Sequence, residues 1–152
     1  MITDLMRNDL GKISAPGTVV TEKIWACEAY TNVFHLLSII SSKALPNHHP
    51  LDLLRSCFPG GSITGCPKLR AMEVIYNSEQ RPRGLYTGSI GYFAANGDFD
   101  FNIAIRTLAF HNGEASLQLG GGIVIDSDPE AEYDETLHKG KTILSLLGCS
   151  LL

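Results

Sequence analysis

Two carboxylates and one ammonium group share a face of the last helix that the sequence predicts. Glu132, Glu135 and Lys139 are spaced by three and four residues, which places them along one stripe of an α-helix. Neighbouring carboxylates repel each other unless a cation lies between them, and magnesium prefers oxygen ligands. The pattern therefore fits a magnesium site. It also fits a solvated helix start, where acids favour the helix dipole and Glu135 forms an ordinary surface pair with Lys139.

Arg106 is the second residue whose type and position suggest chemistry. It alternates with Ala104 and Leu108, so a strand here would carry its guanidinium on an apolar face. Because arginine does not lose its proton, burial requires an anionic partner. That partner is either an internal acid such as Asp100 or the carboxylate of a ligand, which the planar guanidinium matches well. Tyr86 begins the neighbouring predicted strand and either presents its hydroxyl to the same face or fills the core.

Two glycine clusters can receive an anion through exposed backbone N–H groups. One is the run Gly120, Gly121 and Gly122 ahead of the last helix, and the other surrounds Ser62 in residues 58–65. The second cluster is not a nucleotide-binding loop, because Cys and Pro follow it where Lys and Ser or Thr are required, and no dinucleotide fingerprint occurs. Tight turns without a ligand are the alternative for both clusters.

Composition limits the class of protein. The chain has 152 residues, of which 44% are hydrophobic and 18% charged, as in an ordinary globular domain. A net charge of −4 argues against a nucleic-acid partner. No apolar stretch approaches the roughly 20 residues of a membrane span, so no membrane partner is expected. The four cysteines form no metal or disulfide pattern and read as reduced thiols, which indicates a cytoplasmic location.

The elements that must position these residues predict an α+β fold. Strands are expected at 18–28 and 35–43, a short helix at 51–58, and a second helix from Pro67 with its apolar side chains buried. Three further strands, at 85–95, 101–110 and 115–125, are joined by Asn-Gly turns and form an antiparallel meander. The last helix starts at Pro129, capped by Ser127 or Asp128, and runs to about 147. Residues 1–11 read as the end of an element already under way, which suggests a piece of a larger domain.

Several long stretches, in order, resemble the chorismate-binding enzymes. They are DLMRNDLG (4–11), HLLS (35–38), FPGGSITGCPKLRAME (58–73), GSIGY (88–92), IRT (105–107) and GGGIVIDSDPEAEYDET (120–136). The resemblance covers essentially the whole chain. It implies an antiparallel sheet with helices packed outside, part of a two-sheet α/β sandwich. Residues 1–152 would then be the C-terminal portion of a single chorismate-binding domain.

The resemblance also implies a site for a small dicarboxylate. Glu132 and Glu135 match glutamates that hold a magnesium ion, and through it the ring carboxylate of chorismate. Arg106 and Tyr86 match residues that bind the pyruvyl carboxylate, assisted by the backbone N–H groups of Gly120 to Gly122. Magnesium withdraws charge as a ring hydroxyl departs, and ammonia or water then attacks the ring.

Three further residues and one partner follow from the same resemblance. Lys139 matches a lysine near substrate and metal, His35 a histidine close to the reacting ring, and Ser62 a hydroxyl near the ring. A glutamine amidotransferase subunit normally supplies the ammonia. The family's first pair of magnesium-shell glutamates and its lysine base or nucleophile are absent from these 152 residues.

The reaction within the family is a finer question. The amino-acid sequence of residues 58–65 and 88–92 favours amination at carbon 4, as in aminodeoxychorismate synthase component I, which serves para-aminobenzoate and folate synthesis. The wording of 100–106 favours anthranilate synthase component I, which aminates carbon 2 and expels pyruvate. A non-catalytic remnant of such a domain is a third possibility, because half a metal shell binds magnesium weakly.

Overall fold

The computed structural model describes residues 1–30 and 34–148, which form two compact units, Met1–Arg81 and Pro82–Leu152. Both units combine helices with small antiparallel sheets, so the predicted α+β class is confirmed. Cys27, Cys57 and Cys66 carry free thiols, whereas Cys149 lies outside the described residues. No helix in the described part of the chain is both long and apolar enough to cross a bilayer.

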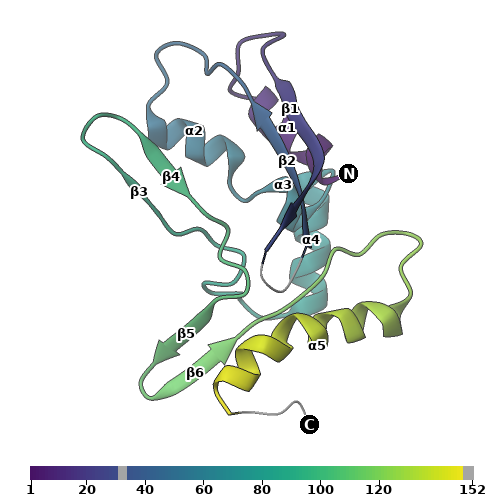
Figure 1. Cartoon of the computed structure of the whole chain (residues 1–152). Helices are drawn as coiled ribbons and strands as arrows, with labels where there is room; N and C mark the ends of the chain where they lie inside the picture. Colours follow the sequence, from purple (N-terminus) through teal and green to yellow (C-terminus); the bar gives the residue numbers. More distant parts are fainter. Residues whose placement is uncertain (31–33, 149–152) are drawn as a thin grey trace. The chain divides into compact units, whose positions relative to one another are not determined.

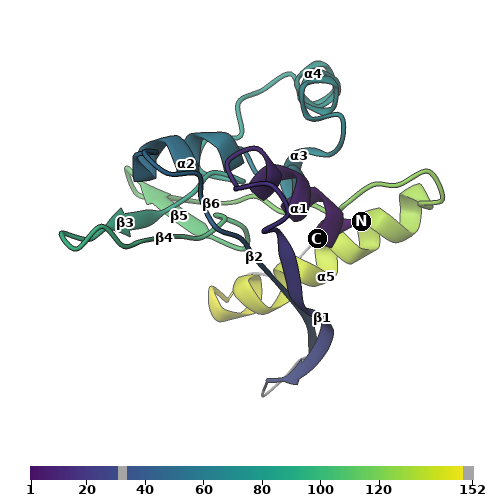
Figure 2. The same cartoon turned by 90° about the horizontal axis from the view of Figure 1, so that it is seen from above.

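Among its described residues, the first unit holds one hairpin and four helices (Figure 1). In chain order its elements are α1 (Ile2–Gly11), β1 (Val20–Ala29), β2 (Phe34–Ser41), α2 (Pro50–Cys57), α3 (Gly61–Thr64) and α4 (Lys68–Glu79). β1 and β2 pair antiparallel, from Val20 opposite Ser41 to Ala29 opposite Phe34, and form a long twisted ribbon (Figure 2). Both strands and the short helix α2 lie where the sequence predicts them.

The hairpin is anchored to α1 through the segments that follow α1 and β2. The Ala15 N–H donates to the Lys43 carbonyl at 2.8 Å, and the Leu45 N–H donates to the Ile13 carbonyl at the same distance. Ile13 is buried at this junction, with 7% of its surface exposed. The junction therefore fixes the end of α1, and the acidic residue in its last turn, relative to the sheet.

One prediction for α4 is wrong. The helix forms, but Leu69 and Tyr76 on its apolar face are each 77% exposed and Met72 is 38% exposed. Ile75 is half-buried. Periodicity marks which face of a helix is apolar, but it does not show what covers that face. In this unit α4 packs chiefly against the four-residue helix α3, which is too short to cover a three-turn face.

In residues 82–148, the second unit contains two separate hairpins and one long helix (Figure 1). The hairpins are β3 (Gly91–Phe93) with β4 (Phe99–Phe101), and β5 (Leu108–His111) with β6 (Glu114–Leu117). The long helix is α5 (Pro129–Leu146), close to its predicted bounds. Asn112 and Gly113 both have positive φ, at 51° and 81°, so the predicted Asn-Gly turn between β5 and β6 is confirmed.

A single three-stranded meander does not form, because the expected middle strand is interrupted. Backbone pairing continues past β4, where the Ala104 N–H donates to the Gly88 carbonyl at 2.9 Å. The Ile105 N–H then donates to the Ile103 carbonyl, which closes a tight turn. Arg106 follows with a φ of 50°, a left-handed conformation outside the region of regular strand backbone. The chain resumes as a strand only at Leu108.

Candidate functional site

The start of α5 is fixed by Asp128, which answers the capping question that the sequence left open. Its carboxylate accepts a hydrogen bond from the Ala131 N–H at 2.9 Å, and Pro129 occupies the first helical position. Ser127 has a different role. Its hydroxyl accepts a bond from the Val124 N–H at 3.1 Å and donates to the Glu132 carboxylate at 2.5 Å. The segment before the helix therefore orients one of the two predicted metal ligands.

A buried glycine in the middle of α5 brings the helix close to the chain segment before the glycine run. A methyl group at Gly140 would overlap the end of the Leu119 side chain, so a larger residue here would require that side chain to shift. Leu119 directly precedes Gly120. The packing of α5 thus places the triple glycine alongside the helix face that carries Glu132 and Lys139.

The glycine run is surrounded by three of the predicted site residues. Lys139 donates a hydrogen bond to the Gly120 carbonyl at 3.3 Å. A methyl group built on Gly121 would lie 3.1 Å from a Glu132 carboxylate oxygen and 3.6 Å from the Lys139 ammonium nitrogen. One built on Gly120 would lie 2.5 Å from the Tyr86 hydroxyl. The structure therefore places Tyr86, Glu132 and Lys139 against the same two glycines.

The backbone donors of this run are available. Within the described residues, no amide N–H of Gly120, Gly121 or Gly122 donates a hydrogen bond. Gly121 and Gly122 are also exposed. An N–H group that donates to no protein atom can donate to a ligand instead. Three such donors beside the Lys139 ammonium group suit an anionic ligand.

Glu135 and Lys139 form the ion pair that the solvated-helix alternative anticipates. Their side-chain atoms lie 2.6 Å apart, and the side chains are 58% and 25% exposed respectively. The hydrogen bond from Lys139 lowers the pKa of Glu135 below its usual value. An exposed pair of this kind adds little stability, so its main effect is to place a neutralising charge next to the second glutamate.

The donor chemistry at α5 fits magnesium, although the described residues do not complete a metal shell. Glu132 and Glu135 offer carboxylate oxygens from one helix face, and magnesium is often held by one or two carboxylates together with water and substrate oxygens. Across residues 1–30 and 34–148, no group of three or more His, Cys, Asp or Glu side chains is arranged to hold a metal. Any ion here would need ligands besides these two glutamates.

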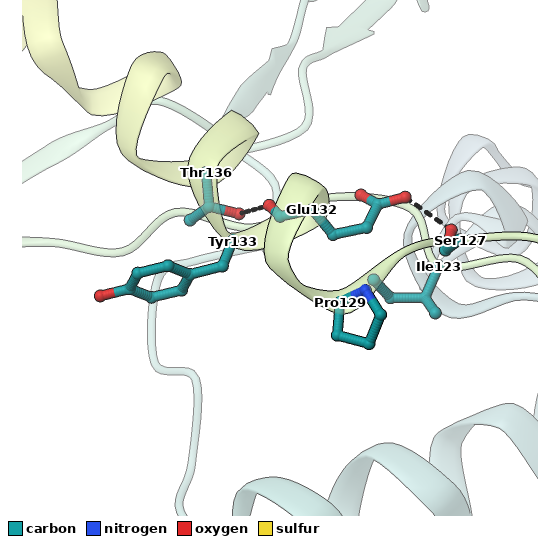
Figure 3. A pocket seen from close by; sticks show the side chains of 6 residues that line it. All are labelled: Ile123, Ser127, Pro129, Glu132, Tyr133 and Thr136. Atoms are coloured by element: carbon teal, nitrogen blue, oxygen red, sulfur yellow. Dashed lines mark hydrogen bonds between the residues drawn. The ribbon is translucent and has the colours of Figure 1, made fainter.

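An open pocket of about 330 Å³ lies beside the first turns of α5 (Figure 3). It is lined by Ile123, Ser127, Pro129, Glu132, Tyr133 and Thr136. Figure 3 shows the Glu132 side chain extending towards Ser127, whereas Tyr133 projects the opposite way. Glu132 is the only predicted site residue in this pocket, so the pocket borders the glycine-run site without coinciding with it.

Arg106 does not have the environment that strand alternation predicted. It lies in the left-handed bend between β4 and β5, and it is exposed. Its guanidinium forms no hydrogen bond or ion pair with any described residue, Asp100 included. The prediction of a buried arginine on an apolar strand face is wrong. An arginine without an internal acid remains able to bind a carboxylate from a ligand.

His35 and Ser62 belong to the first unit. His35 lies on β2, is exposed, and has its ring at the edge of the Tyr30 ring, with centroids 5.4 Å apart. Ser62 is half-buried in α3, and its hydroxyl forms no hydrogen bond with the described residues.

Sequence reasoning assigned no role to Asp9, which the structure buries in α1 with 2% of its surface exposed. Its carboxylate binds Lys12, Lys68 and the Gly61 N–H. Burial alone would raise the pKa of Asp9. The hydrogen bonds from Lys68, Lys12 and Gly61 outweigh burial and hold this pKa below its usual value. Gly61 is 52 residues away in the chain, so no local pattern could have signalled the contact.

Comparison with known proteins gives a consistent family. The sequence profile of the chorismate binding enzyme family matches residues 1–145. The chain is 50% identical to a probable chloroplastic aminodeoxychorismate synthase of Oryza sativa subsp. japonica, over 93% of the chain and 16% of that protein. It is 48% identical to aminodeoxychorismate synthase component 1 of Escherichia coli K12, over 97% of the chain and 32% of that protein. Anthranilate synthase component 1 of Streptomyces coelicolor is 46% identical, over 95% and 28%.

A solved structure supports the same assignment. Anthranilate synthase component I from Streptococcus pneumoniae TIGR4 matches with a TM-score of 0.85 and 43% identity, covering 94% of this chain and 33% of that one. The chain thus spans a third or less of the length of these four proteins. The family match runs through both units and includes the glycine run and the charged face of α5. This chain belongs to the chorismate-binding enzymes.

Proposed function

We propose that this chain contributes the substrate and magnesium site of a chorismate-utilising synthase that aminates carbon 4 and yields 4-amino-4-deoxychorismate. The observation that carries the proposal is the glycine run with three open N–H groups, set between the Tyr86 hydroxyl, the Glu132 carboxylate and the Lys139 ammonium group. The residues at 58–65 and 88–92 support the choice of carbon 4, and relatives named aminodeoxychorismate synthase at 48% and 50% identity are compatible with it.

The pyruvyl carboxylate of chorismate is assigned to the positive side of this site. The amides of Gly120, Gly121 and Gly122 donate to it, and the Tyr86 hydroxyl adds a neutral donor. Arg106 provides the paired N–H groups that match a carboxylate, since no described acid binds its guanidinium.

The ring carboxylate is assigned to magnesium, with Glu132 and Glu135 as the protein ligands from α5. When bound, the ion supplies a Lewis acid that draws charge from the ring as the hydroxyl at carbon 4 departs. Ser127 holds Glu132 in place through its hydroxyl, and Lys139 balances the charge of Glu135. Hydrogen-bonded carboxylate ligands of this kind are oriented before the metal arrives.

His35, Ser62 and Lys139 are assigned to the reacting ring, as hydrogen-bonding or proton-transferring groups. Ammonia comes from a glutamine amidotransferase subunit, in the cytoplasm. We expect that the 152 residues alone do not convert chorismate, because the family's lysine base and its first pair of glutamates are not among them. Parts that act as a unit lose nearly all activity when some are missing.

Amination at carbon 2, as in anthranilate synthase, is the second candidate. The wording of residues 100–106 and the 46% identity to the Streptomyces coelicolor enzyme favour it. The difference of 2 to 4 percentage points between the two groups of relatives does not separate the reactions. A non-catalytic remnant is the third candidate, favoured by the incomplete metal shell.

A pair of chimeras tests the reaction. This chain replaces the matching residues of the Escherichia coli aminodeoxychorismate synthase component 1 in one, and of the Streptomyces coelicolor anthranilate synthase component 1 in the other. Each is incubated with chorismate, Mg²⁺ and an ammonium salt, and the products are separated by liquid chromatography. We expect the E. coli chimera to form 4-amino-4-deoxychorismate, and Glu132→Gln or Glu135→Gln to abolish most of that activity with partial rescue at high Mg²⁺.

The remaining outcomes decide between the candidates. Activity only in the Streptomyces chimera, with anthranilate as product, would favour amination at carbon 2. Two chimeras that fold, as shown by circular dichroism, yet do not consume chorismate would favour the remnant.

A further inference from the structure

Asp9 occupies an unfavourable position for a carboxylate. It lies in the last turn of α1, where the helix dipole disfavours negative charge, and it is almost completely buried. Replacing a buried ion pair by apolar side chains of similar volume is often neutral or stabilising, so stability alone does not explain a charge here. What the charge does accomplish is to bind groups from a distant part of the chain.

One of those groups is the backbone of the glycine-rich turn. The Gly61 N–H, at the start of α3, donates to Asp9 at 2.7 Å. A methyl group on Gly61 would lie 3.1 Å from the same carboxylate oxygen and 3.2 Å from Leu5, so the turn approaches α1 as closely as a glycine permits. Ser62 is the next residue. The position of Ser62 therefore depends on the hydrogen bond that holds the Gly61 amide.

Lys68 holds the other side of the same turn. Its ammonium group lies 2.8 Å from Asp9 and 2.5 Å from the Pro59 carbonyl oxygen that it also binds. Only 20% of its side chain is exposed. Asp9, Lys68 and the backbone of Pro59 and Gly61 therefore form a closed set of hydrogen bonds, which we call the turn clamp. Lys12 also binds Asp9, at 2.9 Å, but its side chain is 44% exposed and no bond joins it to the turn.

We propose that Asp9 and Lys68 are positioning residues, which hold the Ser62 turn in the geometry that chorismate requires. The role of these residues in chorismate binding rests on the proposed function, whereas the hydrogen bonds of the turn clamp do not. The Asp9 carboxylate binds Lys12, Lys68 and Gly61, and Lys68 directs two of its three N–H groups to Asp9 and Pro59, whereas the Ser62 hydroxyl has no partner among the described residues. They act through the turn. A displacement of about 1 Å at a substrate-facing group can cost on the order of 100-fold in rate.

The first test measures the clamp without chorismate. Amide hydrogen exchange of Gly61 is followed by NMR in the whole 152-residue chain and in Asp9→Asn, Lys68→Met, Lys12→Met and Asp4→Asn. Asp4 is the matched control, because it lies on the same helix but is exposed and pairs only locally with Arg7 and the amino terminus. We expect exchange at Gly61 to accelerate by at least about tenfold in Asp9→Asn and to change little in Asp4→Asn. Unchanged protection in a folded Asp9→Asn chain would overturn the clamp.

The second test measures the consequence for chorismate in the E. coli chimera. Asp9→Asn and Lys68→Met should each lower kcat/KM about 10- to 100-fold, and Lys68→Arg should recover most of the loss. Lys12→Met, which touches Asp9 but not the turn, should lose much less. In a double-mutant cycle, Asp9→Asn should add little to Ser62→Ala, because both act through one group.

Each other outcome is decisive. Fully additive losses in the cycle would show that Asp9 does not act through Ser62. Should Asp9→Asn fail to fold, the contrast between Lys68→Met and Lys68→Arg decides: equal losses would overturn the positioning role. An inactive E. coli chimera would refute amination at carbon 4. If the Streptomyces chimera were inactive too, the chorismate role of the clamp would be refuted with it, whereas Gly61 exchange would still show whether Asp9 fixes the turn.

Discussion

Gly120→Ala should disturb the candidate site through a single contact. The added methyl would lie 2.5 Å from the Tyr86 hydroxyl oxygen, whereas real contacts of this kind are not found below 3.0 Å and are ordinary only from 3.4 Å. The hydroxyl must therefore move by 3.0 − 2.5 = 0.5 Å to 3.4 − 2.5 = 0.9 Å, or the glycine run must move instead. Either movement separates the donors that we assign to the pyruvyl carboxylate.

The expected energies follow from two opposing effects. Overpacking costs typically about 1–3 kcal/mol, and the lower cost applies here because Tyr86 is only half-buried. Replacing glycine by alanine also restricts the unfolded chain, which stabilises the fold by about 0.4–1 kcal/mol. The two effects nearly cancel, so we expect Gly120→Ala to lower the free energy of unfolding by no more than about 0.6 kcal/mol. Gly122→Ala is the matched control, since nothing lies within 4 Å of its added methyl, and it should raise that free energy by a few tenths to about 1 kcal/mol.

Urea unfolding of the 152-residue chain, followed by circular dichroism, measures the difference between the two variants. NMR of the Tyr86 ring shows whether the hydroxyl moves in Gly120→Ala and stays in Gly122→Ala. Equal unfolding free energies, with the Tyr86 signals unchanged in both variants, would mean that Tyr86 does not lie against Gly120. The site would then lack the contact between Tyr86 and the glycine run.

Three further predictions concern single side chains. Asp9→Asn should cost about 3 kcal/mol of unfolding free energy, because it breaks a buried charge pair. The folded-state pKa of Asp9 is lowered, so its stabilisation is present above the unfolded pKa near 3.9 and is lost as pH falls through the folded value. Urea unfolding between pH 2 and 7 should therefore show an acid-side decline that is smaller in the variant. Ser127→Ala should weaken Mg²⁺ affinity of the E. coli chimera about 10-fold through loss of its bond to Glu132, measured by Mg²⁺ titration of activity; an unchanged Mg²⁺ requirement would refute that role. Arg106→Ala should change the free energy of unfolding by no more than about 0.5 kcal/mol, because the side chain is exposed. It should weaken chorismate binding by about 2–5 kcal/mol in the chimera, measured as a higher KM. Lower stability with a normal KM would point to a structural role.

Local patterns predicted most of the elements. The β1–β2 hairpin, α2 and α5 are signalled by β-branched runs, by proline at a helix start and by apolar periodicity. The Asn112–Gly113 turn also forms as its dipeptide predicts. These features depend on neighbours within a few residues, so the sequence contains the information directly.

The features that the sequence mispredicted depend on how a segment contacts other parts of the chain. The alternation around Arg106 resembles that of a strand, but the Ile103–Ile105 turn and the left-handed residue after it end the pairing. The apolar face of α4 is real, but no pattern within the helix shows whether another element covers it.

Some residues of the candidate site were predicted and others were not, because local spacing does not show contacts with distant segments. Glu132, Glu135 and Lys139 follow from helical spacing, and the structure adds their contacts with the glycine run. Ser127 was considered only as a cap, although its hydroxyl binds Glu132. Asp9 could not have been found from spacing at all, because its partners Gly61 and Lys68 come from the other end of the first unit.

We propose above that the glycine run beside α5 binds chorismate together with Mg²⁺. The most direct measurement is a titration of the ¹⁵N-labelled 152-residue chain with chorismate, in the presence and absence of Mg²⁺, followed through the amide signals of Gly120, Gly121 and Gly122. NMR detects millimolar binding, so an incomplete metal shell does not prevent the test. We expect saturable shifts of all three amides that are strengthened by Mg²⁺ and reduced in Glu132→Gln. A folded chain whose glycine amides do not respond to millimolar chorismate with Mg²⁺ would contradict it.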